Sequence, residues 1–238
     1  MQAEMKAQAN RLARAAARRA RSRIPVRFGS LRRLSPVSRT FGYDRGLPVD
    51  RYYIERFLGD HADHIQGRVL EIGDNAYTRR FGGTRVTRTD VLNIDAGHPQ
   101  TTIVGDLATA DHIPTASFDC LLITQTLHLI YDLPAAVSTL HRILAPGGTL
   151  LTTCPGISPL SSDRWADSWY WALTPLTAAR LFGDVFGSEN AEVAAHGNVL
   201  TSIAFLEGLA ARELRRTELD VHDPQFPMLI TVKASKSG

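Results

Sequence analysis

The chain has 238 residues, of which 44% are hydrophobic and 21% are charged. This composition is ordinary for a globular protein, and the length suits one α/β domain with or without an added arm. No apolar run approaches the roughly 20 residues that span a bilayer, and the N-terminus lacks the apolar core of a secretory signal. We therefore expect a cytoplasmic protein in which the two cysteines, Cys120 and Cys154, are reduced thiols.

The charge is divided unevenly along the chain. The first 40 residues carry ten arginines and Lys6 against one acid, Glu4, so the net charge of +3 leaves the remainder at −7. Residues 1–23 are rich in the helix formers Ala and Arg but offer few large apolar side chains that would hold a helix to a core. The chain is accordingly read as a basic extension and linker, 1–40, and one domain, 41–238. The arm is expected to be a solvated extension or an electrostatic contact with an anionic membrane surface.

The most informative stretch begins with an apolar strand predicted at 68–72, which ends in a turn at Gly73. A return strand at about 85–91 follows the turn Gly82-Gly83 and carries Asp90 at its tip. This is the shape of the first unit of a nucleotide-binding α/β fold, in which an acid at the end of the second strand accepts ribose hydroxyls. Only one of the three fingerprint glycines is present, so a pyrophosphate ligand such as NAD is disfavoured.

The remaining elements are read from periodicity and from turn residues. Pro48 marks the start of a helix, and Thr174 followed by Pro175 marks the start of another. The further strands are expected at 101–105, 118–124, 149–154, 190–198 and 226–234, and the helices at 48–58, 133–145, 174–186 and 199–214.

Five short motifs follow one another in a recognisable order over residues 66–156. They are V-L-E-I-G (69–73), Asp90, G-D-L (105–107), F-D-C-L-L-I-T (118–124) and L-A-P-G-G-T-L-L (144–151). In order and spacing this series resembles the class I S-adenosylmethionine-dependent methyltransferases, and more closely the bacterial small-molecule or glycan type of methyltransferase domain 11. The departure from the family pattern is the loss of two motif glycines, which are replaced by Asn75 and Tyr77.

The resemblance implies a Rossmann-like α/β fold with a seven-stranded, mostly parallel sheet, an antiparallel last strand and helices on both faces. It implies S-adenosyl-L-methionine as the cofactor. In such proteins Asp106 would accept a hydrogen bond from the adenine amino group, and the residues after strand four would line the reactive end of the cleft. The cofactor-binding residues expected from it are Glu71, Gly73, Asp74, Asn75, Asp90, Asp106, Leu107, Thr124 and Gln125.

Two further features concern catalysis and the acceptor. His128, just past the fourth strand, is the leading candidate for a general base, because an imidazole exchanges protons near neutral pH; a wall or cap histidine is the alternative. The segment 157–175 follows the fifth strand and should overhang the cleft, where aromatic faces stack on sugars and flat rings or pack as a lid. Its candidate substrate-binding residues are Trp165, Trp169, Tyr170 and Trp171. The spacing of cysteines, histidines and acids predicts no metal site.

The leading hypothesis is an O-directed methyltransferase of a small molecule or a sugar or glycan, in glycan or natural-product biosynthesis. One alternative is a binding or regulatory protein that kept the fold without the chemistry, and another is an N-methyltransferase of an amino sugar or natural product. A nucleic-acid methyltransferase is disfavoured, because the fourth strand lacks an N-P-P-Y-type end and the basic arm lacks interleaved aromatic residues. The acceptor and the oligomeric state stay open.

Overall fold

The computed structural model describes residues 6–10, 13–14 and 29–238. Its contacts divide the chain into two compact units, Met1–Ser35 and Pro36–Gly238. In the smaller unit, residues 6–10 and 13–14 are helical. The other residues of 1–28 lie outside the described residues, so the contacts of this part of the arm stay predictions.

The boundary between the two units follows Ser35, slightly before the boundary at residue 40 that the sequence predicts. The backbone N–H of Val37 donates to the Glu207 carboxylate at 3.1 Å, and that of Ser38 donates to the Glu207 carbonyl at 3.0 Å. These bonds tie the end of the predicted linker to the larger unit.

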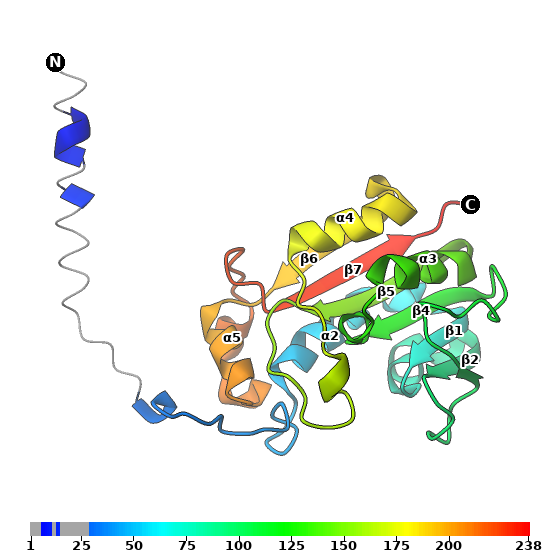
Figure 1. The fold of residues 1–238 in the computed structure, drawn as a ribbon, viewed down its shortest axis with the longest axis horizontal. Helices are drawn as coiled ribbons and strands as arrows, with labels where there is room; N and C mark the ends of the chain where they lie inside the picture. The colour runs from blue at the N-terminus through cyan, green and yellow to red at the C-terminus, as the bar shows by residue number, and fades with distance from the viewer. Residues whose placement is uncertain (1–5, 11–12, 15–28) are drawn as a thin grey trace. The chain divides into compact units, whose positions relative to one another are not determined.

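A seven-stranded sheet forms the centre of the larger unit (Figure 1). Its spatial order is β3-β2-β1-β4-β5-β7-β6. Neighbouring strands are parallel except at β7, which is antiparallel to both β5 and β6. The predicted mostly parallel sheet with an antiparallel last strand is therefore confirmed. The strands are β1 (Gly67–Ile72), β2 (Val86–Asn93), β3 (Ile103–Val104), β4 (Phe118–Thr124), β5 (Leu144–Pro155), β6 (Ala191–His196) and β7 (Leu229–Ser235).

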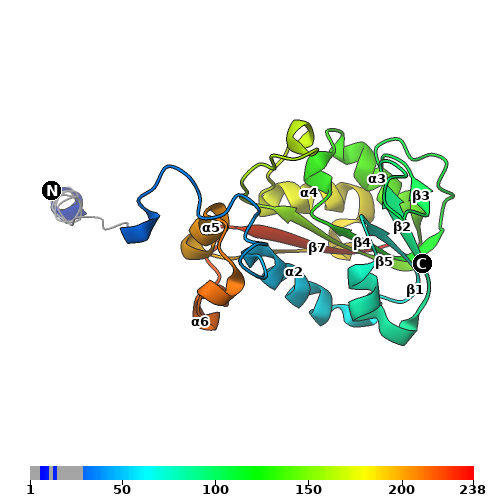
Figure 2. The ribbon, with the colours of Figure 1, turned by 90° about the horizontal axis from the view of Figure 1, so that it is seen from below.

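Helices cover both faces of this sheet, as Figure 2 shows: α3 and α4 lie on one face, and α2 and α5 lie on the other. The alternation of β4 explains the two layers, because Leu121 and Ile123 join the core under α3 and α4 while Cys120 and Leu122 join the core under α2 and α5. The helices are α2 (Val49–Asp60), α3 (Leu133–Ile143), α4 (Pro175–Phe186), α5 (Val199–Leu206) and α6 (Arg216–Leu219).

Short polar residues begin three of these helices. The side chain of Asp132 accepts from the N–H of Ala135 at the start of α3, and Thr174 caps α4 as the sequence predicts. Asn198 forms a capping box with Thr201 at the start of α5. Such caps pair backbone N–H groups that a helix leaves open.

Several elements differ in their bounds from the sequence prediction; β5, for example, begins at Leu144 and not at 149. Strand β2 continues to Asn93, past the predicted end at 91, because Val91 and Leu92 are buried strand residues. A π-helical turn, Thr78–Gly82, lies between β1 and β2. The helix predicted over 199–214 ends at Leu206, and the chain then turns through Gly208 at φ +69°.

Cys120 and Cys154 are both free and buried, as predicted. Within the described part of the chain, no helix has both the length and the apolar character that a membrane crossing needs.

Candidate active site

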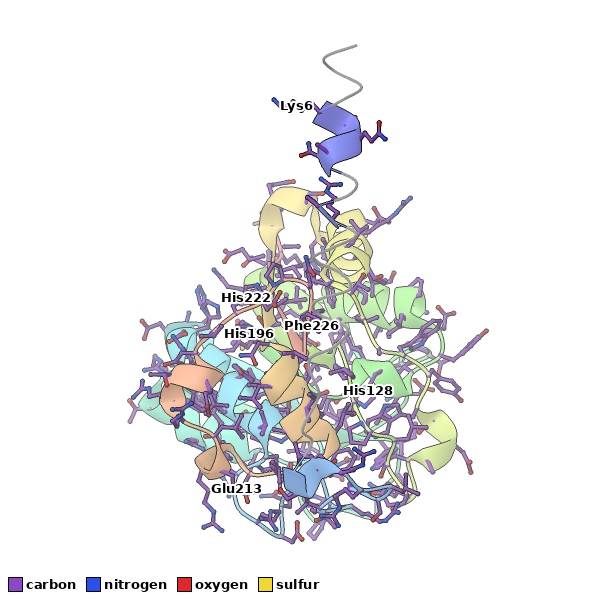
Figure 3. All side chains as sticks on the ribbon, turned by 90° about the vertical axis from the view of Figure 1, so that its left-hand side faces the viewer. Lys6, His128, His196, Glu213, His222 and Phe226 are labelled. Atoms are coloured by element: carbon purple, nitrogen blue, oxygen red, sulfur yellow. The ribbon has the colours of Figure 1, made fainter. Side chains whose placement is uncertain are left out.

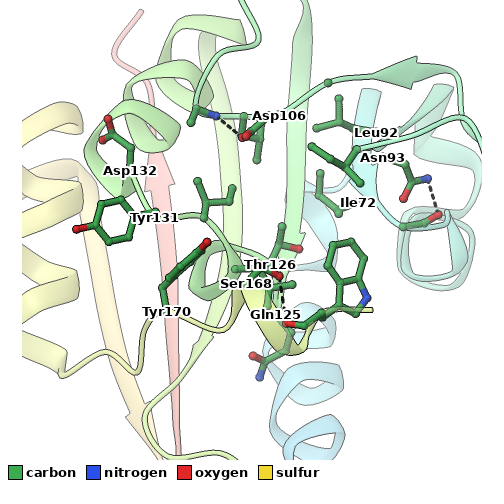
Figure 4. Close-up of a pocket in the computed structure, with 18 of the residues that line it drawn as sticks. Ile72, Leu92, Asn93, Asp106, Gln125, Thr126, Tyr131, Asp132, Ser168 and Tyr170 are labelled. Carbon is green, nitrogen blue, oxygen red and sulfur yellow. Dashed lines mark hydrogen bonds between the residues drawn. The ribbon is translucent and has the colours of Figure 1, made fainter. Parts of the chain in front are cut away.

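A cavity of about 700 Å³ opens at the carboxyl ends of β1, β2 and β4 (Figure 4). We call it the strand-end cavity. Open α/β sheets bind ligands at this edge, where neighbouring strands send their connections to opposite faces. The residues from the strand ends and the loops after them that line it include Ile72, Gly73, Leu92, Asn93, Asp106, Leu107, Thr124, Gln125, Tyr131, Trp165 and Tyr170.

The turn after β1 brings backbone to the cavity wall. Gly73 has φ +85°, which favours glycine, and a Cβ built there would meet no protein atom within 4 Å. The Asn93 side chain donates to the carbonyl of Gly73 at 3.1 Å and to Thr101 Oγ1 at 2.9 Å. These two bonds use both amide protons of Asn93, so its oxygen is the atom that it can offer to a ligand.

Glu71 lies beneath this turn and does not line the strand-end cavity. Its buried carboxylate accepts from the backbone N–H groups of Tyr77 and Thr78 and from the Thr78 hydroxyl, at 3.1, 2.8 and 2.7 Å. Burial raises the pKa of Glu71 to about 7, although these hydrogen bonds favour the ionised form. Glu71 therefore fixes the loop through its hydrogen bonds.

Asp74 and Asn75 also serve the loop and not the cavity wall. Asp74 accepts from the N–H of Ala76 at 2.7 Å, and the Asn75 oxygen accepts from the side chain of Gln100 at 3.1 Å. Neither side chain lines the strand-end cavity.

The prediction that Asp90 lies at the end of its strand is wrong, because the strand continues past it. It is 2% exposed, within β2, and its carboxylate accepts from Arg68 Nε at 2.7 Å and from Thr102 Oγ1 at 3.0 Å. Burial opposes ionisation, but these bonds and the nearby guanidinium groups hold the pKa of Asp90 below its usual range. The residue at the strand end is Asn93, so Asp90 is a buried ion-pair partner away from the cavity.

Asp106 and Leu107 lie on the cavity wall between β3 and β4, where the sequence predicts a contact. One carboxylate oxygen of Asp106 accepts from the N–H of Ala108 at 2.9 Å (Figure 4). Leu107 is buried and adds apolar surface next to it. This pairing of an acid with an apolar wall suits a flat ring that carries an amino group.

Gln125 stands at the end of β4 in an unusual backbone conformation. Its φ is +47°, and its N–H donates to the carbonyl of Thr153 on β5 at 3.0 Å. A non-glycine residue in this region stores strain, and such residues gather at functional sites.

A second cavity, of about 510 Å³, adjoins the first. We call it the aromatic cavity. Gln125, Leu129 and Trp165 line both cavities, so the two meet at the end of β4. Its other lining residues come from the segment before α2, the start of α2, the turn after β4, the loop after β5 and the end of α5; they include Arg39, Phe41, Tyr43, Asp50, Arg51, His128, Ser158, Asp163, Trp169 and Phe205.

His128 lines the aromatic cavity from the turn Leu127–Leu129 (Figure 3). It is 2% exposed, and neither ring nitrogen has a hydrogen-bond partner among the described residues. Burial, with a smaller contribution from the Arg51 guanidinium, lowers the pKa of His128 to about 4. The imidazole is therefore neutral at physiological pH, with one nitrogen able to accept a proton.

Asp50 is a second buried polar residue on the same cavity, contributed by the first turn of α2. It is 6% exposed, and its Oδ1 has no hydrogen-bond partner in the described part of the chain. Burial raises the pKa of Asp50, while Arg51, with Nε 4.0 Å from Asp50 Oδ2, lowers it.

The aromatic segment after β5 closes over both cavities, as predicted from its position. Trp165 lines both, Trp169 lines the aromatic cavity, and Tyr170 lines the strand-end cavity. Trp171 lines neither; it stacks on Tyr131 at 5.9 Å. The backbone N–H groups of Tyr170 and Trp171 donate to the carbonyl of His128, so the segment is fastened to the turn after β4.

The lining residues of these cavities that sequence reasoning missed include Asn93, Asp50 and Phe41. Asn93 could have been found by extending β2 through its buried Val-Leu pair. Asp50 and Phe41 carry no motif, and only the packing of α2 and the segment before it brings them to the end of β4. The search of the described residues for three clustered histidines, cysteines or acids finds none that could hold a metal ion.

Residues 73–152 match the family model described as "Methyltransferase domain". The malonyl-[acyl-carrier protein] O-methyltransferase of Serratia marcescens is 26% identical over 202 residues, which are 76% of this chain and 79% of that protein.

Two solved structures resemble the fold. The chain is 13% identical to a SAM-dependent methyltransferase from Archaeoglobus fulgidus, with a TM-score of 0.52 and coverage of 78% of this chain and 94% of that chain. It is 12% identical to the N-methyltransferase NodS from Bradyrhizobium japonicum, solved with S-adenosyl-L-homocysteine, with a TM-score of 0.52 and coverage of 85% and 95%. At these identities the likeness is one of fold.

Proposed function

Because this chain is a class I S-adenosylmethionine-dependent methyltransferase, we propose that it methylates an oxygen atom of a small molecule or sugar, in glycan or natural-product biosynthesis. The observation that carries this proposal is the junction of the two cavities. Gln125, Leu129 and Trp165 line both cavities. The buried His128, which lies between Gln125 and Leu129 in the sequence, faces the aromatic cavity. One cavity is assigned to the cofactor and the other to the acceptor.

The strand-end cavity fits S-adenosylmethionine. Gly73 presents backbone without a side chain on its wall. We assign a bond from a ribose hydroxyl to the Asn93 oxygen and a bond from the adenine amino group to Asp106, because both residues line this cavity. The loss of two motif glycines is compatible with this ligand, which has no phosphate to crowd the turn. We assign the ribose contact to Asn93 in place of Asp90, because Asp90 is buried within its strand and paired with Arg68.

The cofactor supplies an electrophilic methyl group and its own leaving group. The residues of the chain have to orient the acceptor, exclude water and receive one proton. We assign proton acceptance to the neutral imidazole of His128: the acceptor oxygen gains the methyl group, the sulfur keeps the bonding electron pair, and the hydroxyl proton moves to the imidazole. Alignment at near-contact distance supplies several kcal/mol of the barrier, and a positioned base contributes about 10²–10⁴-fold.

Oxygen is favoured over nitrogen on two grounds. A neutral base beside the acceptor is needed for a hydroxyl but not for a free amine, and the relative from Serratia marcescens is named an O-methyltransferase. The fold does not decide between oxygen and nitrogen acceptors, because NodS has a similar fold and is named an N-methyltransferase. The non-catalytic alternative is disfavoured by a neutral histidine where a base is required.

The basic arm is assigned a contact with an anionic membrane surface, and the protein a cytoplasmic location, as the sequence predicts. Most of the arm lies outside the described residues, so its charge pattern alone supports this part. Co-sedimentation with anionic and with neutral vesicles, using the full chain and a chain lacking residues 1–23, tests it: salt-sensitive binding to anionic vesicles should require the arm.

The proposal as a whole is tested in two measurements. Calorimetric titration of the full chain with S-adenosylmethionine and S-adenosylhomocysteine should give saturable binding to both. Transfer of a labelled methyl group should then be followed with hydroxyl, amine and carboxylate acceptors. Label found only on amines would contradict oxygen transfer, and a folded protein that binds neither ligand would remove the enzyme assignment.

A further inference from the structure

Two buried polar groups in the aromatic cavity lack partners. Asp50 Oδ1 and both ring nitrogens of His128 are the buried side-chain atoms without a hydrogen-bond partner among the described residues. Both side chains line the same cavity, although they come from α2 and from the turn after β4. An unpaired buried polar group is costly, and native structures rarely keep one without a reason such as a ligand.

The chemistry of the two groups restricts what can pair with both. A neutral imidazole has one donor and one acceptor nitrogen, and a carboxyl group accepts when it is ionised. A hydroxyl both donates and accepts, so it can satisfy either group. A carboxylate ligand only accepts, so it cannot pair with an ionised Asp50. A molecule with at least two hydroxyls can satisfy Asp50 and His128 together.

The rest of the wall suits a ring with flat, weakly polar faces. The rings of Phe41 and Trp169 stack with their centroids 5.9 Å apart and an interplanar angle of 10°. The centroid of the Phe205 ring lies 6.2 Å from that of Phe41. Trp169 in turn lies 4.5 Å from the His128 ring, measured between ring centroids. The C–H faces of a saturated ring pack on such surfaces while the hydroxyls at its rim reach polar groups.

Two arginines line this cavity, the exposed Arg39 and the half-buried Arg51, and Arg51 is the one beside Asp50. Arg51 Nε donates to the Tyr43 hydroxyl at 2.8 Å and lies 4.0 Å from Asp50 Oδ2. The Nε–H of the guanidinium is thus engaged, and an ionised Asp50 offsets part of its charge. A carboxylate placed against an ionised Asp50 would meet like charge in a buried site.

We propose that the acceptor is a polyhydroxylated ring, a sugar or a cyclitol, held at two hydroxyl groups: one reacts beside His128 and the other is bound by Asp50. This inference rests on the proposed methyltransferase function and adds Asp50 as the residue that selects the acceptor class. Nothing in the family motifs points to Asp50, which lies before the first strand.

The test compares Asp50→Asn with the full-length wild type. Asparagine keeps the size of the side chain and removes the carboxylate. Asp60→Asn is the matched control, because Asp60 lies at the other end of α2 and outside the aromatic cavity. The probes are methyl hexopyranosides and myo-inositol, their monodeoxy counterparts, cyclohexanol, and a monocarboxylic acid, each with labelled S-adenosylmethionine.

We expect wild-type turnover of at least one polyol. Asp50→Asn should lower kcat/KM for that polyol about tenfold or more, as expected for losing a hydrogen bond to a charged group. It should change turnover of the corresponding monodeoxy compound or cyclohexanol less than twofold, and the affinity for S-adenosylhomocysteine should stay within twofold. Asp60→Asn should behave as wild type throughout.

Three outcomes would overturn the inference while the enzyme assignment survives. They are equal losses on polyols and single alcohols in Asp50→Asn, turnover of the carboxylic acid but of no polyol, and no turnover of any polyol by a protein that binds S-adenosylhomocysteine. Absence of S-adenosylhomocysteine binding in the folded wild type is a different result, because it removes the proposed function itself. Thermal unfolding of each variant shows whether it is folded.

Discussion

The two cavities that meet at Gln125 are built in different ways. The strand-end cavity is formed by strand ends and the loops after them, and its polar groups are largely paired: Asn93 with Gly73 and Thr101, and Asp106 with Ala108. The aromatic cavity is assembled from five separate stretches of chain and keeps unpaired polar atoms.

This difference indicates that one cavity suits the cofactor and the other suits the acceptor. A cofactor common to many enzymes can be held by backbone turns and strand ends that any sheet of this order provides. An acceptor particular to one enzyme needs side chains placed by loops and by an added N-terminal segment. Experiments that affect one cavity and leave the other unchanged would test this division.

The largest effect is expected at His128. In His128→Gln we expect kcat to fall about 10²–10⁴-fold, because the hydroxyl loses its base, while S-adenosylhomocysteine affinity changes less than twofold. His196→Gln is the control, since burial also lowers the pKa of His196 to about 4 but this histidine lies in another cavity (Figure 3). Steady-state kinetics and calorimetry measure the two quantities.

The pH dependence of the wild type gives an independent check of the same histidine. With its pKa near 4, His128 is neutral throughout the range from pH 5.5 to 8. The rate should therefore show no histidine titration near pH 6.5. A limb with an apparent pKa near 6.5 that disappears in His128→Gln would contradict the buried, neutral imidazole.

The contrast between the cavities also explains what the sequence could and could not predict. Five of the nine expected cofactor residues line the strand-end cavity, because each belongs to a motif at a strand end and strand ends follow from local patterns. They are Gly73, Asp106, Leu107, Thr124 and Gln125. Asp50 and Phe41 could not be predicted, because local patterns do not say where α2 packs. His128 and Trp169 were found from their place after a strand, but the sequence could not show that they share one wall.

The failure at Asp90 has a specific physical cause and supplies the second prediction. The alternating residues before it suggest a strand that ends there, but two buried apolar residues carry the strand on to Asn93. Asp90→Ala should lower the free energy of unfolding by about 2 kcal/mol, because Arg68 and Thr102 lose a charged acceptor. Its S-adenosylhomocysteine affinity should change less than threefold.

Asn93→Ala should show the reverse. Its affinity for S-adenosylhomocysteine should fall about tenfold, and its free energy of unfolding should change less than that of Asp90→Ala. Urea unfolding and calorimetry on the two variants separate structure from binding. If Asp90→Ala abolished binding at a concentration where it is folded, the ribose contact would return to Asp90.

Gly73 offers a third test, confined to the strand-end cavity. Gly73→Ala and Gly147→Ala place the same methyl group at φ +85° and φ +76°, and neither meets a protein atom within 4 Å. The backbone strain is therefore similar, about 1 kcal/mol. Only Gly73 lines the cavity, so only Gly73→Ala should weaken S-adenosylmethionine binding, by about tenfold. Equal binding in the two variants would mean that the ligand does not approach this turn.

The last effect concerns stability and not ligand binding, and it is expected from Glu71, which fixes the loop after β1 through its hydrogen bonds. Burial raises its pKa from 4.5 to about 7, so the folded protein binds this proton more tightly than the unfolded chain does. The contribution of Glu71 to stability is therefore full below about pH 4.5 and declines as the pH rises through about 7, with a slope of at most about 1.4 kcal/mol per pH unit. Glu71→Gln cannot titrate, so the difference in unfolding free energy between wild type and variant should fall over this window and be constant above it. A difference that rises with pH would mean that the bonds from Tyr77 and Thr78 outweigh burial and keep the carboxylate ionised.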